Sequence, residues 1–256
     1  MKVTPMKGRM QKISSQNDNC PQKNRTESDC YAGVQTFMGI TENHLTEVQF
    51  TKEDLLERIL SPPNMNLAYR RVVSNGGSGG FDRMETEDLL SYLSQNKDVL
   101  ISSLLGGHYH PNPVLRVEIP KAGGKKRQLG IPTVFDRLVQ QSIAQILSPL
   151  YERDFSASSY GFRPGRNAHQ ALSKARGYIS DGYKYAVDLD LEKFFDTVNH
   201  SRLIELLSRR IKDGRVISLI HGYLLAGVMI GGHYQDSVQG TPQGGLCITV
   251  HKPPYV

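Results

Sequence analysis

Two aspartates, Asp188 and Asp190, stand at the end of an apolar run, and their spacing is the feature of the chain best suited to chemistry. Tyr185, Val187 and Leu189 alternate with polar or small residues, a pattern typical of a strand with one buried face. We therefore expect both carboxylates on one side of a strand. Mg²⁺ is commonly held by one or two carboxylates together with substrate phosphates. The spacing predicts a phosphate-handling metal site, with solvated acids on an exposed strand edge as the alternative.

The densest positive charge lies between two predicted strands, Arg116 to Ile119 and Gln128 to Ile131. The connecting segment, Pro120 to Arg127, carries four basic residues around two glycines. Such a loop can hold a triphosphate or a nucleic-acid backbone through charge-assisted hydrogen bonds. The pattern predicts an anion-binding hairpin, and a solvated basic turn is the alternative.

Two further loops carry residue types that suit nucleic acids. The turn Tyr160 to Arg166 offers Phe162 as a stacking face and Arg163 and Arg166 as phosphate contacts, which suits a single strand. The glycine-rich stretch Ser74 to Asp82 lacks the lysine and hydroxyl residue of a P-loop, so we interpret it as a flexible turn.

Apolar residues at helical spacing predict the elements that position these loops. A capped helix is expected to begin near Asp54, and Thr133 is expected to cap another helix together with Asp136. The remaining expectations are a helix stop at Pro62-Pro63, helices over Met65 to Val73 and Leu89 to Leu105, a stop at Pro149, a helix around Ala168 to Ile179, a helix capped near Asn199 and stopped at Asp213-Gly214, a helix from Arg215 to Ala226, and a hairpin about Gly231-Gly232.

Composition and charge indicate the kind of partner and the cellular compartment. Residues 1–100 carry 12 Lys and Arg against 13 Asp and Glu, whereas residues 101–256 carry 19 against 12. A basic surface around an acidic pocket suits a nucleic-acid backbone that is steered toward a metal site. The three cysteines have no metal-ligand spacing, no apolar run reaches the length of a membrane span, and the polar N-terminal residues lack the apolar core of a signal peptide. We expect a cytoplasmic protein without a membrane anchor.

Four features follow one another in a fixed order: the basic hairpin, the turn Tyr160 to Arg166, the stretch Asp-Leu-Asp-Leu-Glu-Lys-Phe-Phe-Asp that begins at Asp188, and Thr-Pro-Gln-Gly-Gly that ends at Gly245. Together they resemble the reverse transcriptases encoded within bacterial group II introns, from about Leu60 to Gly245. The resemblance implies an α+β fold, with the fingers and part of the palm of a right-hand polymerase. It implies RNA-directed DNA polymerase activity, a nucleotidyltransferase reaction on an intron RNA template and a DNA primer.

The resemblance also implies a metal site. Asp190 stands five residues before Phe195, the family's spacing between the first metal-binding aspartate and the aromatic steric gate. Asp190 is thus the expected catalytic ligand for Mg²⁺, helped by the Leu191 carbonyl and by Asp188. The family's chemistry uses two metal ions.

The incoming deoxynucleoside triphosphate (dNTP) has its own expected residues. Phe195 would lie under the sugar, where a bulky ring leaves no room for a 2′-hydroxyl, whereas Phe194 suits a core position. Lys121 and Arg127 resemble the family's triphosphate-binding cations, and Gln243 resembles the residue that lies against the nucleotide. The loop Asn75 to Asp82 occupies the place of the family's template-clamping loop.

The chain departs from the family after Gly245. A polymerase of this kind needs a Tyr-x-Asp-Asp turn, and these 256 residues contain no Asp-Asp dipeptide. We expect a truncated or frameshifted chain that lacks the second half of the palm and the thumb, is inactive alone, and needs a second polypeptide or an oligomer to complete the palm. A non-catalytic, maturase-like module that binds intron RNA is the alternative. The expected domains are a polar, partly disordered leader (1–50), a fingers-like region (51–183), a partial palm (184–245) and a divergent tail (246–256).

Overall fold

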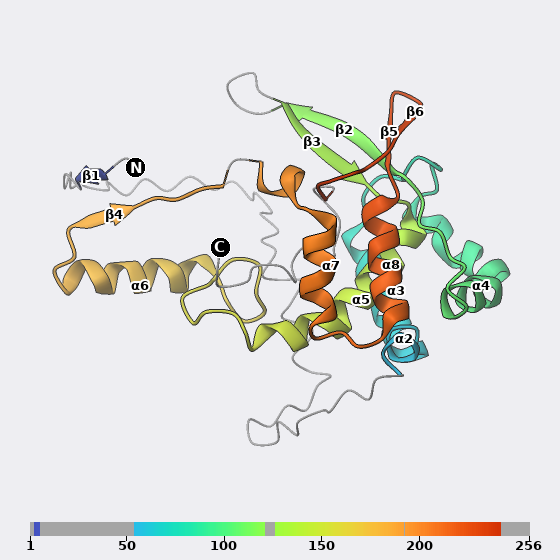
Figure 1. The fold of residues 1–256 in the computed structure, drawn as a ribbon, viewed down its shortest axis with the longest axis horizontal. Helices are drawn as coiled ribbons and strands as arrows, with labels where there is room; N and C mark the ends of the chain where they lie inside the picture. The colour runs from blue at the N-terminus through green and yellow to red at the C-terminus, as the bar shows by residue number, and fades with distance from the viewer. Residues whose placement is uncertain (1–2, 6–53, 121–125, 192, 242–256) are drawn as a thin grey trace, which may run out of the picture. The chain divides into compact units, whose positions relative to one another are not determined.

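The computed structural model describes residues 3–5, 54–120, 126–191 and 193–241 (Figure 1). The chain forms two compact units. Of the described residues, the smaller unit holds 3–5 and 155–191, and the larger unit holds 54–120, 126–154 and 193–241. The predicted domain boundaries therefore stay a prediction, because the leader and the tail lie largely outside these ranges.

The larger unit is built on α5 (Val134–Glu152), which is buried along most of its length. Thr133 caps this helix by accepting a hydrogen bond from the Asp136 backbone N–H at 3.2 Å, as predicted. Helix α3 (Pro62–Asn75) packs along α5, and α7 (His200–Ser208) packs along α8 (Gly214–Leu225) (Figure 1). The largest fully buried apolar side chains of the core are Leu56, Ile59, Leu89, Val134, Leu138, Val139, Ile143, Leu147 and Val216.

Helix α2 (Leu55–Ile59) ends before Pro62-Pro63, as predicted. These two prolines also open α3, ahead of its predicted start at Met65, because proline at the first helical positions needs no N–H partner. The predicted helix stop at Pro149 was wrong. Pro149 lies inside α5, which continues to Glu152. Helix α4 (Leu89–Leu105) has its predicted bounds. None of the described helices is both long enough and apolar enough to cross a membrane.

The sheet of the larger unit has the strand order β3-β2-β5-β6. Strands β2 (Val114–Pro120) and β3 (Lys126–Ile131) form an antiparallel hairpin that is longer than predicted. Strand β5 (Val228–Ile230) runs parallel to β2 and turns into β6 (His233–Gln235), which confirms the second predicted hairpin. The basic hairpin is therefore one edge of a mixed sheet.

A buried carboxylate joins this sheet to α5. Asp136 accepts hydrogen bonds from the Tyr109 hydroxyl at 2.7 Å, the Thr133 hydroxyl at 2.6 Å, and the backbone and side-chain N–H groups of Asn112 at 3.2 and 3.1 Å. Burial, followed by the negative charge of Asp136, raises the pKa of Tyr109 above its ordinary range. The segment that leads into β2 is thus held at the first turn of α5.

A second carboxylate joins α2 to α8. Asp213 is buried and accepts hydrogen bonds from the backbone N–H groups of Arg215 at 3.0 Å and Leu56 at 3.1 Å. Asp213 therefore caps α8, where the sequence predicted it as the stop of α7. The Arg215 guanidinium bridges Asp213 at 3.0 Å and Glu57 at 2.6 Å. Burial alone would raise the pKa of Asp213, but these hydrogen bonds outweigh it and the pKa is lowered.

The smaller unit contains α6 (Ala168–Ser180) and β4 (Tyr185–Val187), with β1 (Val3–Pro5) paired antiparallel to β4. Asn167 and Gln170 form a capping box at the start of α6. Every residue of β4 is exposed, and no residue in the range 155–191 is buried. The prediction of a strand with one buried face was therefore wrong within the described residues.

We expect Asp213→Asn to lower the free energy of unfolding by about 1–3 kcal/mol at pH 7, because the Leu56 N–H and Arg215 lose a charged partner. The folded-state pKa of Asp213 is depressed, so its stabilisation is complete above the ordinary carboxyl pKa and is lost as pH falls through the folded pKa. The gap between variant and wild type should therefore narrow below about pH 4.

Urea unfolding followed by far-UV circular dichroism across a pH series measures this gap. Asp98→Asn is the control, since the Asp98 side chain is 95% exposed and 3.9 Å from Lys97. A gap of equal size at pH 7 and pH 3.5 would contradict the assigned role.

Candidate nucleotide and nucleic-acid site

The predicted steric gate, Phe195, lies on a short 3-10 helix, η2 (Phe194–Thr197), in the larger unit. Lys193 precedes this helix with a φ of +51°, which turns the chain sharply at its start. The rings of Phe194 and Phe195 pack edge to face with centroids 5.4 Å apart. Both residues are half-buried, so the expectation that Phe194 is a core residue was wrong.

The backbone before Gln243 is hydrogen-bonded to the Phe195 segment. The Gly240 N–H donates to the Val198 carbonyl at 2.8 Å, and the Thr241 N–H donates to the Phe195 carbonyl at 2.7 Å. A Cβ on Gly240 would lie 2.8 Å from the Asp196 carbonyl oxygen, and the φ of Gly240 is +83°. Only glycine meets both conditions without strain.

His200 also contacts this segment, although no sequence pattern singles it out. The His200 side chain is buried, and its Nε2 lies 2.7 Å from the Gly240 carbonyl oxygen. Because a carbonyl only accepts, Nε2 carries the hydrogen in this bond. Asn199 caps α7 by accepting from the Arg202 N–H at 2.9 Å and so fixes where His200 enters the helix. Gln243 itself lies outside the described residues.

The predicted metal ligands belong to the smaller unit. Asp188, Asp190 and Leu191 lie after the end of β4 and all three are exposed. Within the described ranges, no group of three or more His, Cys, Asp or Glu residues is arranged to hold a metal ion. Two solvent-facing carboxylates fit part of the oxygen ligand set that Mg²⁺ prefers, with phosphates or water as the remaining ligands.

The basic hairpin places Arg127 on β3, where its backbone pairs with Ile119 of β2. Lys126 donates to the Glu118 carboxylate at 2.6 Å, and this hydrogen bond raises the pKa of Lys126. The other predicted triphosphate ligand, Lys121, lies outside the described residues. Lys126, one of the basic residues of the hairpin, is therefore paired with Glu118 on the facing strand.

The turn Tyr160 to Arg166 is folded by its own arginines. Arg163 donates to the Ser156 and Ser159 carbonyls at 2.7 and 3.0 Å, and Arg166 donates to the Ala157 carbonyl at 3.2 Å. Both arginines were predicted as phosphate contacts, but part of each guanidinium is hydrogen-bonded to these backbone carbonyls. Phe162 is 83% exposed with a φ of +56°, which leaves its ring available for stacking.

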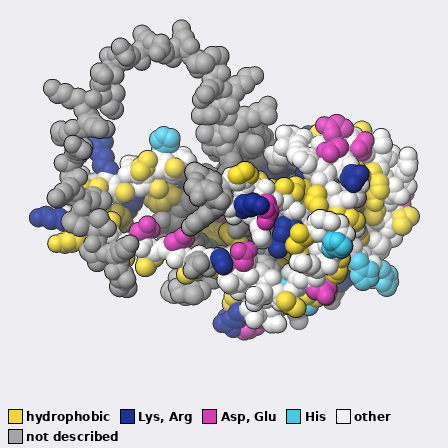
Figure 2. All heavy atoms as spheres, turned by 90° about the horizontal axis from the view of Figure 1, so that it is seen from above, with side chains coloured by type: hydrophobic (Ala, Val, Ile, Leu, Met, Phe, Trp, Pro, Cys, Tyr) yellow, Lys and Arg dark blue, Asp and Glu magenta, His cyan; other side chains and the backbone are white. Residues whose placement is uncertain are grey.

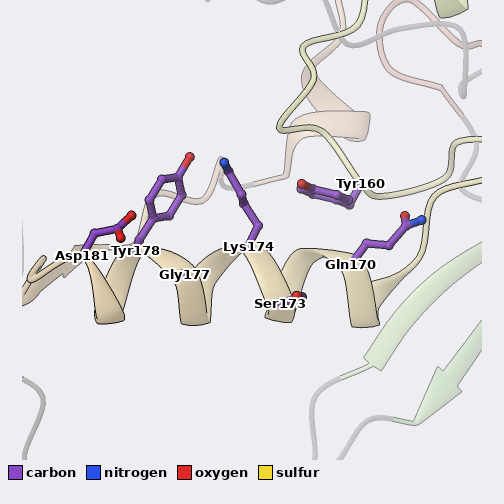
Figure 3. Close-up of a pocket in the computed structure, with 7 residues that line it drawn as sticks. All are labelled: Tyr160, Gln170, Ser173, Lys174, Gly177, Tyr178 and Asp181. Atoms are coloured by element: carbon purple, nitrogen blue, oxygen red, sulfur yellow. The ribbon is translucent and has the colours of Figure 1, made fainter.

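A shallow pocket of about 360 Å³ runs along α6, with Tyr160 at one end (Figure 3). Lys174 and Tyr178 project on the same side of the helix, with Lys174 Nζ 5.0 Å from the ring centroid of Tyr178 (Figure 3). The pocket contains none of the predicted catalytic residues. On the face of the molecule seen in Figure 2, basic and acidic side chains are interspersed rather than gathered into one block.

A family model described as reverse transcriptase (RNA-dependent DNA polymerase) matches residues 119–247, half of the chain. The chain belongs to the reverse transcriptase family. The matched range includes β3, the Asp190 segment, Phe195 and Gln243.

Curated relatives connect this chain with group II introns. Protein YkfC of Escherichia coli is 35% identical over 207 residues, which cover 78% of this chain and 54% of that protein. The group II intron-encoded protein LtrA of Lactococcus lactis is 36% identical over 80% of this chain and 34% of its own length. Nuclear intron maturase 2 of Arabidopsis thaliana is 40% identical over 38% of this chain and 13% of its own length. The chain thus spans about half of YkfC and a third of LtrA.

Among solved structures, a chain of a partial Cas6-RT-Cas1–Cas2 complex has a TM-score of 0.50 with 23% identity, covering 75% of this chain and 32% of that chain. At this identity the likeness supports the fold alone. The mixed α+β architecture is that of a reverse transcriptase fragment, as the motif order predicted.

We expect Gly240→Ala to loosen the Gly240-Thr241 segment from the reverse transcriptase's η2 helix and to lower the free energy of unfolding by about 2–4 kcal/mol. The added Cβ would meet the Asp196 carbonyl, and the positive φ adds strain. Gly232→Ala is the matched control, because Gly232 has a φ of +87° and no atom within 4 Å of an added Cβ.

Urea unfolding of the two variants measures the difference between them. The control should lose only the part that arises from backbone strain, about 1–2 kcal/mol. Equal losses in the two variants would show that the close approach to Asp196 has no energetic effect.

Proposed function

We propose that this chain carries the nucleotide-binding part of a group II intron RNA-directed DNA polymerase. The observation that carries the proposal is the family match over residues 119–247, which contains the Asp190 segment, Phe195 and Gln243 in family order. The intron-encoded relatives support the intron as the RNA source. Intron RNA is then the template, a DNA strand is the primer, and dNTPs are the substrates.

In this proposal Asp190 is the catalytic carboxylate, with Asp188 as an auxiliary and the Leu191 carbonyl as a further oxygen ligand. Mg²⁺ bound there supplies activation of the primer 3′-hydroxyl and neutralisation of the leaving pyrophosphate. The exposure of these residues supports access by a polymeric substrate. No other described carboxylates join them to form a three-residue group.

The remaining roles concern the incoming nucleotide. Lys121 and Arg127 bind its triphosphate, Phe195 excludes a 2′-hydroxyl, and Gln243 lies against the base and sugar. The hydrogen bond from the Thr241 N–H to the Phe195 carbonyl supports the pairing of Phe195 with Gln243, which follows Thr241 by two residues. The rigid backbone around Gly240 suits a site that must hold one geometry.

A second candidate function is a non-catalytic module that binds intron RNA. It is favoured by relatives named as intron maturases. Either function can involve a second polypeptide or an oligomer that completes the palm. A cytoplasmic location is part of both proposals, in keeping with three cysteines that lack a metal or disulfide pattern.

We expect the 256-residue chain to show no primer extension above the background of Asp190→Ala. These 256 residues lack the Asp-Asp carboxylates that the family uses beside Asp190. Loss of such a main electrostatic component commonly removes about 3 kcal/mol or more of transition-state stabilisation, which lowers the rate at least about a hundredfold. The assay uses a DNA primer on an RNA template with dNTPs and Mg²⁺. Robust synthesis that Asp190→Ala abolishes would refute the expectation of inactivity while supporting the role of Asp190.

We also expect the chain to bind single-stranded RNA with an affinity that falls steeply with salt, since phosphate contacts release counterions. Arg127→Ala should reduce the slope of log K against log salt by about 0.7, the contribution of one phosphate contact on a single strand. Lys97→Ala is the control, because Lys97 is exposed beside Asp98 on α4. Filter binding measures both slopes, and an unchanged slope in Arg127→Ala would remove the hairpin from the interface.

A further inference from the structure

The segment Gly76 to Asp82, here called the glycine loop, is held by an arginine of α5. Arg137 donates from Nη1 to the Gly76 carbonyl at 3.2 Å and from Nη2 to the Ser78 carbonyl at 2.8 Å. From the other side, the Glu85 carboxylate accepts from the Gly79 N–H at 3.1 Å. Three backbone groups of the glycine loop are thus fixed by two charged side chains, and such hydrogen bonds are stronger than neutral ones.

Close packing removes most of the remaining freedom of the glycine loop. A Cβ on Gly80 would lie 2.7 Å from the Thr133 Cα, and a Cβ on Gly79 would lie 2.7 Å from the Met84 carbonyl oxygen. Gly80 is therefore pressed against the residue that caps α5. The sequence suggested a flexible turn, but Gly79 and Gly80 serve close backbone approach rather than freedom of movement.

The fixed glycine loop ends in a tight turn that presents an aromatic ring. The Arg83 N–H donates to the Gly80 carbonyl at 3.1 Å, and Arg83 has a φ of +59°. Phe81 is 36% exposed at the corner of this turn, and Asp82 and Arg83 are exposed beside it. The Asp82 carboxylate accepts from the Met84 N–H at 3.3 Å, so this acid is directed back to the turn.

We propose that Arg137 is a positioning residue for RNA: it holds the glycine loop in the shape in which Phe81 stacks on a base of single-stranded RNA and Arg83 meets a phosphate. The proposal rests on the proposed function, which requires that the chain bind RNA. An exposed aromatic ring beside a cation is the arrangement that binds single strands with little dependence on sequence.

Arg137 acts from α5, through its hydrogen bonds to the glycine loop, and does not itself contact RNA. It is half-buried, its Nε is buried without a hydrogen-bond partner among the described residues, and burial lowers its pKa. Both of its terminal nitrogens are committed to the loop carbonyls. A lysine at this position would keep the charge but could not donate to both loop carbonyls in the planar geometry of the guanidinium.

Fluorescence anisotropy with a labelled 15-nucleotide oligouridine tests the proposal on the 256-residue chain. Arg137→Lys keeps the charge and releases the glycine loop, whereas Gly80→Ala keeps Arg137 and forces the loop away from Thr133. Phe81→Ala removes the ring. Each should weaken RNA binding at least about fivefold, the lower end of the cost of losing one stacked base. Gly214→Ala is the control, because nothing lies within 4 Å of its added Cβ.

A double variant distinguishes a positioning role of Arg137 from a direct contact of Arg137 with RNA and from a general loss of structure. If Arg137 acts by positioning the glycine loop, the ring of Phe81 is already misplaced in Arg137→Lys, so Arg137→Lys together with Phe81→Ala should bind RNA no more weakly than Arg137→Lys alone. Independent effects would instead multiply, and that result would overturn the proposal. Far-UV circular dichroism checks that each variant is folded, and Phe81→Ala with Gly80→Ala decides the matter if Arg137→Lys does not fold.

The outcomes for the proposed function are distinct. Wild-type RNA binding that all three single variants retain would overturn the role of Arg137 and leave the proposed function intact. Weakening by Arg137→Lys alone, with Gly80→Ala and Phe81→Ala at wild-type affinity, would mean that the guanidinium contacts RNA directly and would also overturn it. A wild-type chain that does not bind RNA at any salt concentration would remove the proposed function and this inference together.

Discussion

The larger unit depends on the first turn of α5. The buried carboxylate of Asp136 accepts bonds from Tyr109, Asn112 and the capping hydroxyl of Thr133, and so fixes where the chain enters β2. One residue further on, Arg137 holds the glycine loop from the same turn. A buried carboxylate is stable only when donors satisfy it, so these segments are bound to one helix end rather than placed independently.

The segments that carry the predicted site residues differ in how firmly they are packed. Around Phe195, backbone hydrogen bonds, a glycine with no room for a side chain and the buried His200 fix the chain up to Thr241. Asp188 and Asp190, in contrast, belong to the smaller unit, in which residues 155–191 include no buried side chain. The Phe195 segment thus rests on a packed scaffold, whereas the segment of the two aspartates does not.

Local sequence chemistry predicted what depends on near neighbours. The caps at Thr133 and Asn199 and both hairpins follow from residues within a few positions of one another. Contacts between distant segments escaped prediction. Nothing near His200 in the sequence indicates Gly240, because their hydrogen bond joins residues 40 positions apart.

The sequence alone determined the family and the residues eligible for its chemistry, because motif order and residue type are properties of a linear chain. The tertiary structure decided which of those residues are free to act. Arg163 and Arg166 carry the charge that a phosphate needs, yet each donates to backbone carbonyls of the preceding turn. The glycine loop likewise has a flexible composition and a fixed shape, since Arg137 of α5 donates to two of its carbonyls and Gly80 packs against Thr133.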